Sequence, residues 1–148
     1  MFGTSFGQRR AAAYQQVEVQ TGVTTADPHR LVLMLYDGAI MAITSAEVAM
    51  QNKQIATKGE SVSKAIEIIT NGLKVSLNLE QGGELAERLA ALYDYLCDRL
   101  IYANLHNNQA ALEEVKGLLV GLREAWQQIA PGAGNTAATG MSQQAVAS

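Results

Sequence analysis

The sequence predicts an all-α fold, an antiparallel up-down four-helix bundle with a short N-terminal helical cap. Three observations favour this fold. The chain has 148 residues and only two prolines, and no proline lies between Pro28 and Pro131. Alanine and leucine are abundant in that span, which favours helices over β-strands. Apolar residues also recur there at three- and four-residue spacing, in four segments of about 20 residues that would each be about 30 Å long as helices.

The chain divides into an arm, a helical body and a tail. We assign residues 1–26 to the arm with its cap, residues 27–130 to the bundle, and residues 131–148 to a tail that is expected to be disordered because it is small, polar and uncharged. The first 17 residues of the arm carry Arg9 and Arg10 and no acid. The whole chain has a net charge of −3, which argues against nucleic acid as a partner.

The first two helices are expected on either side of a short connection. The first should run from Pro28 to Gln51, because Asp27 is a suitable N-cap and proline has no N–H to leave unpaired in the first turn. Residues 52–60 are interpreted as the connection. The second helix should run from about Glu60 to Leu79, with an apolar stripe at helical spacing.

The last two helices are bounded by glycine, proline and a short turn. The third should run from Glu84, after the break at residues 81–83, to about Leu105, and the fourth from Gln109 to Ala130, before Pro131. Four glycines fall inside the expected helices and are interpreted as places where helices pack closely: Gly38, Gly72, Gly117 and Gly121.

The first helix carries more apolar side chains than one bundle-facing stripe requires. If Leu31, Leu35, Gly38 and Ala42 face the bundle, further apolar residues lie partly outside it: Val32, Met34, Tyr36, Ile40, Met41 and Ile43. The other helices add Ile68, Val75, Tyr95, Ile101, Tyr102, Leu118 and Val120. Two explanations stay open, a wide core with scattered surface residues or a hydrophobic groove for another chain. The apolar-edged arm favours the groove, because it could cover such a groove in the free protein.

Motifs of common catalytic and metal sites are missing from the sequence. Neither His29 nor His106 has a glutamate three residues before it, as a di-iron bundle requires, and there is no P-loop, GxSxG or CxxC motif. His29 is expected to be solvated or capping at a helix start, His106 to lie in a surface turn, and Cys97 to be a small core residue. We therefore expect no enzyme, no cofactor and no metal.

Residues 31–50 are apolar enough to consider as a membrane-spanning helix. Asp37 and Glu47 would be costly in hydrocarbon, so a buried helix of a soluble protein is the preferred interpretation. The N-terminus has no recognisable secretory signal, and the single cysteine fits a reducing compartment.

Four blocks of the sequence resemble the flagellin-specific export chaperone family of bacteria, the FliS type. They are AYQQVEV with Tyr14 and Val17, ADPHRLVLMLYDGAI (26–40), KAIEIITNGLKVSLNLEQGGELAERLAALYDYLCDRLIYANLHN (64–107) and EEVKGLLVGLREAW (113–126). Each block is a weak pattern, but together they occur in the order and spacing of the family. The resemblance covers roughly residues 10–131 and leaves out the last 17 residues.

The resemblance implies a cytoplasmic chaperone that holds the C-terminal segment of flagellin in hydrophobic grooves, prevents premature polymerisation and delivers flagellin to the flagellar type III export apparatus. It also implies that the export gate is a partner in the client-loaded state, and that Tyr14 is the tyrosine of a displaceable cap. The residues expected to contact the partner are Tyr14, Val17, Met34, Ile40, Met41, Ile68, Val75, Tyr95 and Tyr102. The alternative, of a different class, is a helical adaptor that self-associates through the same apolar surface, a homodimer included.

Overall fold

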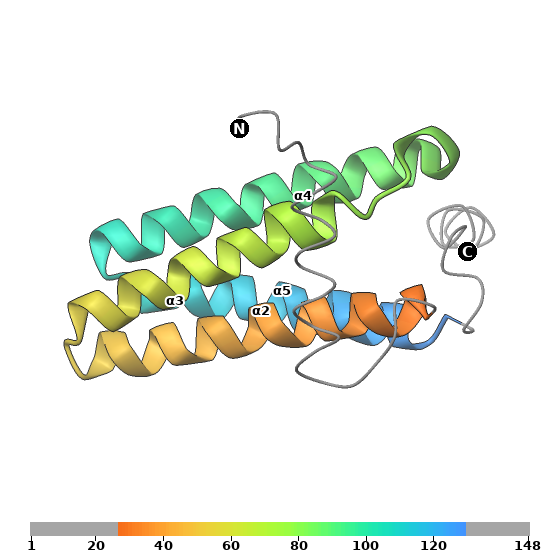
Figure 1. The fold of residues 1–148 in the computed structure, drawn as a ribbon. Coiled ribbons are helices and arrows are strands. Elements are labelled where there is room, and N and C mark those ends of the chain that lie inside the picture. Colours follow the sequence, from red (N-terminus) through yellow and green to blue (C-terminus); the bar gives the residue numbers. More distant parts are fainter. Residues whose placement is uncertain (1–26, 130–148) are drawn as a thin grey trace, which may run out of the picture.

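The computed structural model describes residues 27–129, without the side chains of Glu80 and Gln81. This part of the chain forms an antiparallel bundle of helices (Figure 1) and confirms the predicted fold class. The expected cap over residues 1–26 and the expected tail over residues 131–148 lie outside the described residues. The elements are α2 (Pro28–Gln51), α3 (Ile55–Ile68), its π-helical continuation η1 (Ile69–Lys74), α4 (Leu79–His106) and α5 (Gln109–Gln127).

The helices follow one another around the bundle in sequence order. α2 packs against α3 and α5, while α4 packs against η1 and α5. The start of α2 and the end of α5 are joined by two hydrogen bonds, from His29 Nε2 to the Trp126 carbonyl oxygen at 2.9 Å and from Trp126 Nε1 to the His29 carbonyl oxygen at 2.8 Å. Their rings stack with centroids 5.2 Å apart. His29 is 5% exposed, so the expected solvated role is wrong, whereas its ring N–H does bond a carbonyl oxygen in the last turn of α5.

The boundaries of α2 and the start of α5 are those that the sequence predicts. Asp27 accepts a hydrogen bond from the Arg30 N–H at 3.1 Å, and Pro28 occupies the first turn of α2. Asn108 caps α5 by accepting from the Ala111 N–H at 2.9 Å. In both places a polar side chain satisfies a backbone donor that the helix itself leaves free.

The second helix begins earlier than expected, at Ile55, so the connection is shorter than the expected residues 52–60. Lys58 explains the difference. Its ammonium group is buried and donates to the Asn104 carbonyl oxygen at 3.0 Å and to Asn107 Oδ1. Asn104 and Asn107 lie at the C-terminal end of α4. Lys58 therefore connects the first turn of α3 to the end of α4 through hydrogen bonds.

The same helix continues through η1 and ends at Lys74 rather than at Leu79. The chain then enters α4, which is interrupted at Gly83, where φ is 57° and ψ is −138°. This left-handed φ favours glycine, so the expected break before Glu84 is confirmed as a kink inside α4. α5 ends at Gln127, shortly before the expected Ala130.

The bundle interior is filled by aliphatic side chains from every helix. Tyr36 and Ile43, which we expected partly outside the bundle, are 3% and 0% exposed. α3 covers one side of α2 and α5 another, so a wider arc of α2 is buried than a single stripe would give. The Tyr36 and Tyr93 hydroxyls hydrogen-bond to each other at 2.6 Å. The largest fully buried side chains are Leu31, Ile43, Ile69, Leu73, Leu96, Leu100, Leu112, Val115 and Leu119.

The four helical glycines differ in their surroundings. A Cβ built at Gly72 would lie 2.9 Å from Leu35 Cδ2, and one at Gly38 would lie 3.3 Å from Ile68 Cδ1. At these two positions the expected close packing is confirmed. At Gly117 and Gly121, apart from the backbone of the helix itself and the adjacent residues, no described atom would come within 4 Å of a Cβ, so the expected close packing is wrong there.

By length and composition alone, α2 is the one helix of the described part that could cross a membrane. Its two carboxylates are paired with α5. Lys116 Nζ donates to Glu47 Oε1 at 2.6 Å, and the Arg123 guanidinium pairs with Asp37. α2 therefore has the contacts of a buried bundle helix on two of its sides.

Candidate functional site

The residues expected to contact a partner fall into four places. Tyr14 and Val17 lie outside the described residues. Met34, Met41, Ile68 and Val75 lie along the line where α2 meets α3 and η1, whereas Ile40 lies towards α5, and Tyr95 and Tyr102 lie on α4. The structure thus brings four of the nine residues together and separates the rest.

Close helix packing brings those four residues together. Ile68 covers Gly38 of α2, and Leu35 of α2 covers Gly72 of η1. Met34 and Met41 lie about one helical turn on either side of Gly38, and Val75 follows the last turn of η1. All four residues therefore flank the contact between α2 and the second helix.

Much of this apolar surface is open to solvent. Met41 is 70% exposed, while Met34, Ile68 and Val75 are partly buried. Val48, which follows Met41 by seven residues on α2, is 50% exposed, and the sequence reasoning missed it. Val48 lies seven residues after Met41 and fourteen after Met34, and this helical spacing could have identified it as part of the same surface. We call these five residues the α2–η1 surface: Met34, Met41, Val48, Ile68 and Val75.

Ile40 has a different setting. It is partly buried and packs against the hydrophobic core. It precedes Glu47 by seven residues, and Glu47 pairs with Lys116 of α5. Residues seven apart share a helix face, so Ile40 lies on the side of α2 that meets α5 and not on the α2–η1 surface.

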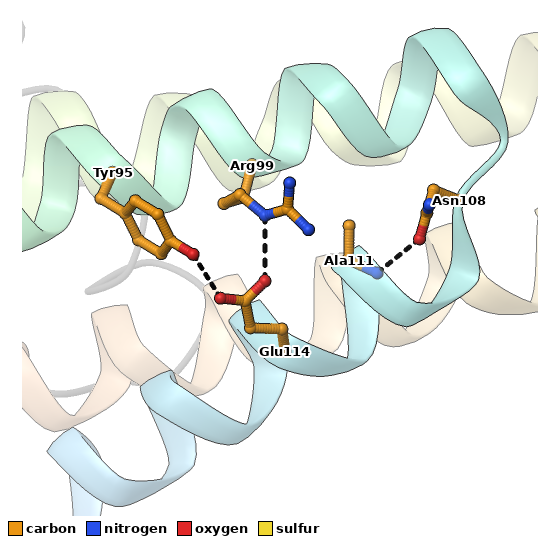
Figure 2. Close-up of polar contacts among 5 residues, drawn as sticks. All are labelled: Tyr95, Arg99, Asn108, Ala111 and Glu114. Carbon is orange, nitrogen blue, oxygen red and sulfur yellow. Dashed lines mark hydrogen bonds and ion pairs between the residues drawn. The ribbon is translucent and has the colours of Figure 1, made fainter.

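A second surface lies where α4 meets α5 (Figure 2). Tyr95 and Tyr102 of α4 are 43% and 40% exposed. The Tyr95 hydroxyl and Arg99 Nε, the latter at 2.9 Å, both donate to the carboxylate of Glu114 on α5. The Arg99 guanidinium lies 4.8 Å from the centre of the Tyr102 ring. We call these four residues the α4–α5 aromatic surface: Tyr95, Arg99, Tyr102 and Glu114.

The hydrogen bonds at Glu114 shift the pKa values of two groups on this surface. The bond from Tyr95, and then that from Arg99, lower the pKa of the Glu114 carboxyl. The bond to Glu114 raises the pKa of the Tyr95 hydroxyl. Both shifts favour a charged carboxylate and a neutral phenol, the forms in which the hydrogen bonds from Tyr95 and Arg99 to Glu114 are made. Tyrosine and arginine are the side chains that most often dominate protein interfaces.

Sequence reasoning found only half of this second surface. Arg99 lies four residues after Tyr95 and three before Tyr102, so helical spacing could have identified it. Glu114 comes from another helix, and only the packing of α4 on α5 brings it to Arg99.

The described residues offer little for catalysis. No group of three His, Cys, Asp or Glu side chains that could hold a metal ion occurs within residues 27–129. Cys97 is only partly buried, with its Sγ 3.5 Å from Thr70 Oγ1, and burial raises the pKa of its thiol. A raised pKa makes a thiol a poorer nucleophile. His106 lies at the surface as expected, beside the Tyr102 ring.

Comparison with known proteins decides what kind of bundle this is. Residues 10–133 match the family model described as "Flagellar protein FliS". The chain belongs to the FliS family. It is 50% identical over 119 residues to the flagellar secretion chaperone FliS of Salmonella typhimurium, covering 80% of this chain and 88% of the relative.

Other FliS relatives cover the chain to a similar extent. Identity is 42% over 123 residues to the flagellar secretion chaperone FliS of Escherichia coli, covering 83% of this chain and 90% of the relative. Identity is 37% over 121 residues to that of Bacillus subtilis, covering 82% and 86%. The predicted resemblance is confirmed, and membership of the FliS family supports an export-chaperone role in flagellum biogenesis.

Proposed function

We propose that this chain is a cytoplasmic, non-catalytic export chaperone that binds the disordered C-terminal segment of flagellin. Binding prevents premature polymerisation, and the loaded chaperone delivers flagellin to the gate of the flagellar type III secretion apparatus. The observation that carries the proposal is the α2–η1 surface, where Met41 and Val48 are 70% and 50% exposed although the core beneath them is filled.

The apolar area of this surface provides the driving force for binding. Burying a methionine side chain stabilises a complex by roughly 1.5–3 kcal/mol when the whole side chain leaves water. Met34 and Met41 are also flexible, so they adapt to side chains of different shape. A disordered client loses conformational freedom when it binds, which keeps the net affinity moderate and favours release at the export gate.

The two carboxylates of α2 are both neutralised by ion pairs. Asp37, which lies between Met34 and Met41 on the same face of α2, is paired with Arg123 of α5, and Glu47 is paired with Lys116. An apolar client segment therefore meets no unpaired carboxylate of α2 when it lies against α3 and η1.

The arm is proposed to cover the same surface in the free chaperone. It joins the bundle at Asp27, and Met34 lies only seven residues further along α2. Tyr14 and Val17 would then be replaced by the client. We expect Tyr14→Ala to change client affinity while far-UV circular dichroism keeps its helical amplitude, and a loss of that amplitude would show that Tyr14 is part of the core instead.

The α4–α5 aromatic surface is proposed as a second contact for the same client. Tyr95 and Tyr102 present their rings in positions fixed by Glu114 and Arg99. Ile40, on the α5 side of α2, is proposed as a contact at the edge of the bundle. A client long enough to cross several helices could engage all of these places at once.

Isothermal titration calorimetry with a flagellin C-terminal peptide tests the proposal. We expect a 1:1 complex, and we expect Met41→Glu to weaken it at least tenfold, because a charge would replace an apolar contact. Ile101→Glu is the matched control, since Ile101 is 54% exposed but lies on α4 and belongs to neither of the two surfaces.

Light scattering separates this proposal from a self-associating adaptor. The chaperone should remain monomeric alone and gain the mass of one peptide on binding. A chain that forms oligomers without the peptide, and loses them through Met41→Glu, would favour the adaptor.

A further inference from the structure

We propose that Asn71 is a specificity-determining residue, whose side-chain oxygen accepts a hydrogen bond from a main-chain N–H of the client. The α2–η1 surface would then select a non-helical stretch of the bound chain. This inference rests on the proposed client binding and adds the backbone conformation that the surface accepts.

The Asn71 side chain is unusual among the polar groups of the bundle. Its Oδ1 atom is buried, and no hydrogen-bond partner for it exists among the residues that the structure describes. Buried side-chain oxygens are nearly always hydrogen-bonded, so one without a partner requires an explanation. The client would displace the atoms that cover this oxygen in the free chain and would supply the missing donor.

The local backbone also singles out this position. Asn71 lies within η1, a π-helical turn of six residues, Ile69–Lys74. π-Helical turns occur frequently at functional sites. On α-helical spacing the sequence places Asn71 on the solvent side, opposite the apolar stripe, yet its Oδ1 atom is buried.

Asn71 stands among the residues of the α2–η1 surface. The next residue, Gly72, packs under Leu35, so Asn71 lies level with the part of α2 that carries Met34. Ile68 precedes it by three residues and Val75 follows it by four. A single polar acceptor is therefore flanked by apolar side chains on a surface that attracts apolar segments.

The chemistry of this surface defines the client backbone that fits. Inside a helix the main-chain N–H groups already bond to carbonyl oxygens of the same helix. An extended or irregular segment has free N–H groups, which need an acceptor once water is excluded. Such a segment satisfies Asn71 Oδ1, whereas the side of a continuous helix leaves the oxygen unpaired.

The test measures binding of a flagellin C-terminal peptide and of its single N-methylated analogues, each lacking one main-chain N–H, to the whole chain. We expect one N-methylated position to weaken binding to the wild type about five- to tenfold. We expect Asn71→Leu to weaken binding of the unmodified peptide by a similar factor and to abolish the effect at that position. Thr70→Val is the matched control, because Thr70 precedes Asn71 in η1 but contacts Cys97 of α4.

A second readout separates a binding role from a structural one. Removing an unpaired buried oxygen should leave the free chaperone at least as stable, so the melting temperature of Asn71→Leu should equal or exceed that of the wild type. A lower melting temperature with unchanged peptide binding overturns the inference and leaves the proposed function intact.

The analogues decide the question even if Asn71→Leu fails to fold. If no N-methyl group weakens binding to the wild type more than twofold, the inference is wrong. If the wild type does not bind the unmodified peptide, the proposed function itself fails, and the inference fails with it.

Discussion

Replacing Gly72 or Gly121 by alanine should change the stability of the bundle in opposite directions. At Gly121, apart from the backbone of α5 itself and the adjacent residues, no described atom lies within 4 Å of the new Cβ. Alanine in an exposed helix interior is more favourable than glycine by about 1 kcal/mol. Gly121→Ala should therefore stabilise the chain by about that amount.

At Gly72 the same gain is opposed by overpacking. The new Cβ would lie 2.9 Å from Leu35 Cδ2 and 3.3 Å from Leu35 Cδ1. Carbon atoms prefer separations of about 3.5–4.0 Å, and Leu35 is only 2% exposed, so it has little room to move. Overpacking of this kind costs about 1–3 kcal/mol. The net expectation for Gly72→Ala is a loss of about 1 kcal/mol, which puts the two variants about 2 kcal/mol apart.

Urea denaturation followed by circular dichroism measures this difference directly. Both variants should keep the wild-type dependence of the unfolding free energy on urea, so that the midpoints report stability alone. If Gly72→Ala stabilises the chain as much as Gly121→Ala does, the close contact between α2 and η1 described above is incorrect.

Two further predictions concern polar groups inside the bundle. Burial raises the pKa of Tyr36 and of Tyr93 above the ordinary tyrosine value of 10.0, so the unfolded chain loses these protons first. Their contribution to stability is present below pH 10 and should decline above it, by up to about 1.4 kcal/mol per pH unit for each hydroxyl. The double variant Tyr36→Phe/Tyr93→Phe should unfold with a shallower alkaline slope, and an unchanged slope would contradict this assignment. Lys58→Met should lower the free energy of unfolding by about 2–3 kcal/mol, because the acceptors of Asn104 and Asn107 lose their hydrogen bonds to the ammonium group. Urea denaturation measures this loss. A loss under about 0.5 kcal/mol would show that these hydrogen bonds contribute little.

Local signals in the sequence were sufficient for most of the fold. The bounds of α2 follow from Asp27 and Pro28 at its start, and the kink in α4 follows from Gly83. The start of α3 could not be predicted in this way, because it depends on hydrogen bonds from Lys58 to the end of α4. Interactions between residues far apart in the sequence leave no local pattern.

The same limit applies to individual side chains. His29 appeared exposed from its place at a helix start, but Trp126 of α5 covers it. Helical spacing could have found Val48 and Arg99, whereas Glu114 and the buried oxygen of Asn71 required the packed structure. The apolar excess of α2 was predicted correctly at Met41 and incorrectly at Ile43, because the sequence alone did not show how much of α2 its two neighbours cover.

Methyl NMR of ¹³C-labelled methionine tests the central claim most directly, since the chain has five methionines. On titration with a flagellin C-terminal peptide, the methyl resonances of Met34 and Met41 should shift. That of Met50, which packs against the core on the same helix, should stay in place. Shifts at Met50 with unchanged Met34 and Met41 signals would contradict client binding at the α2–η1 surface.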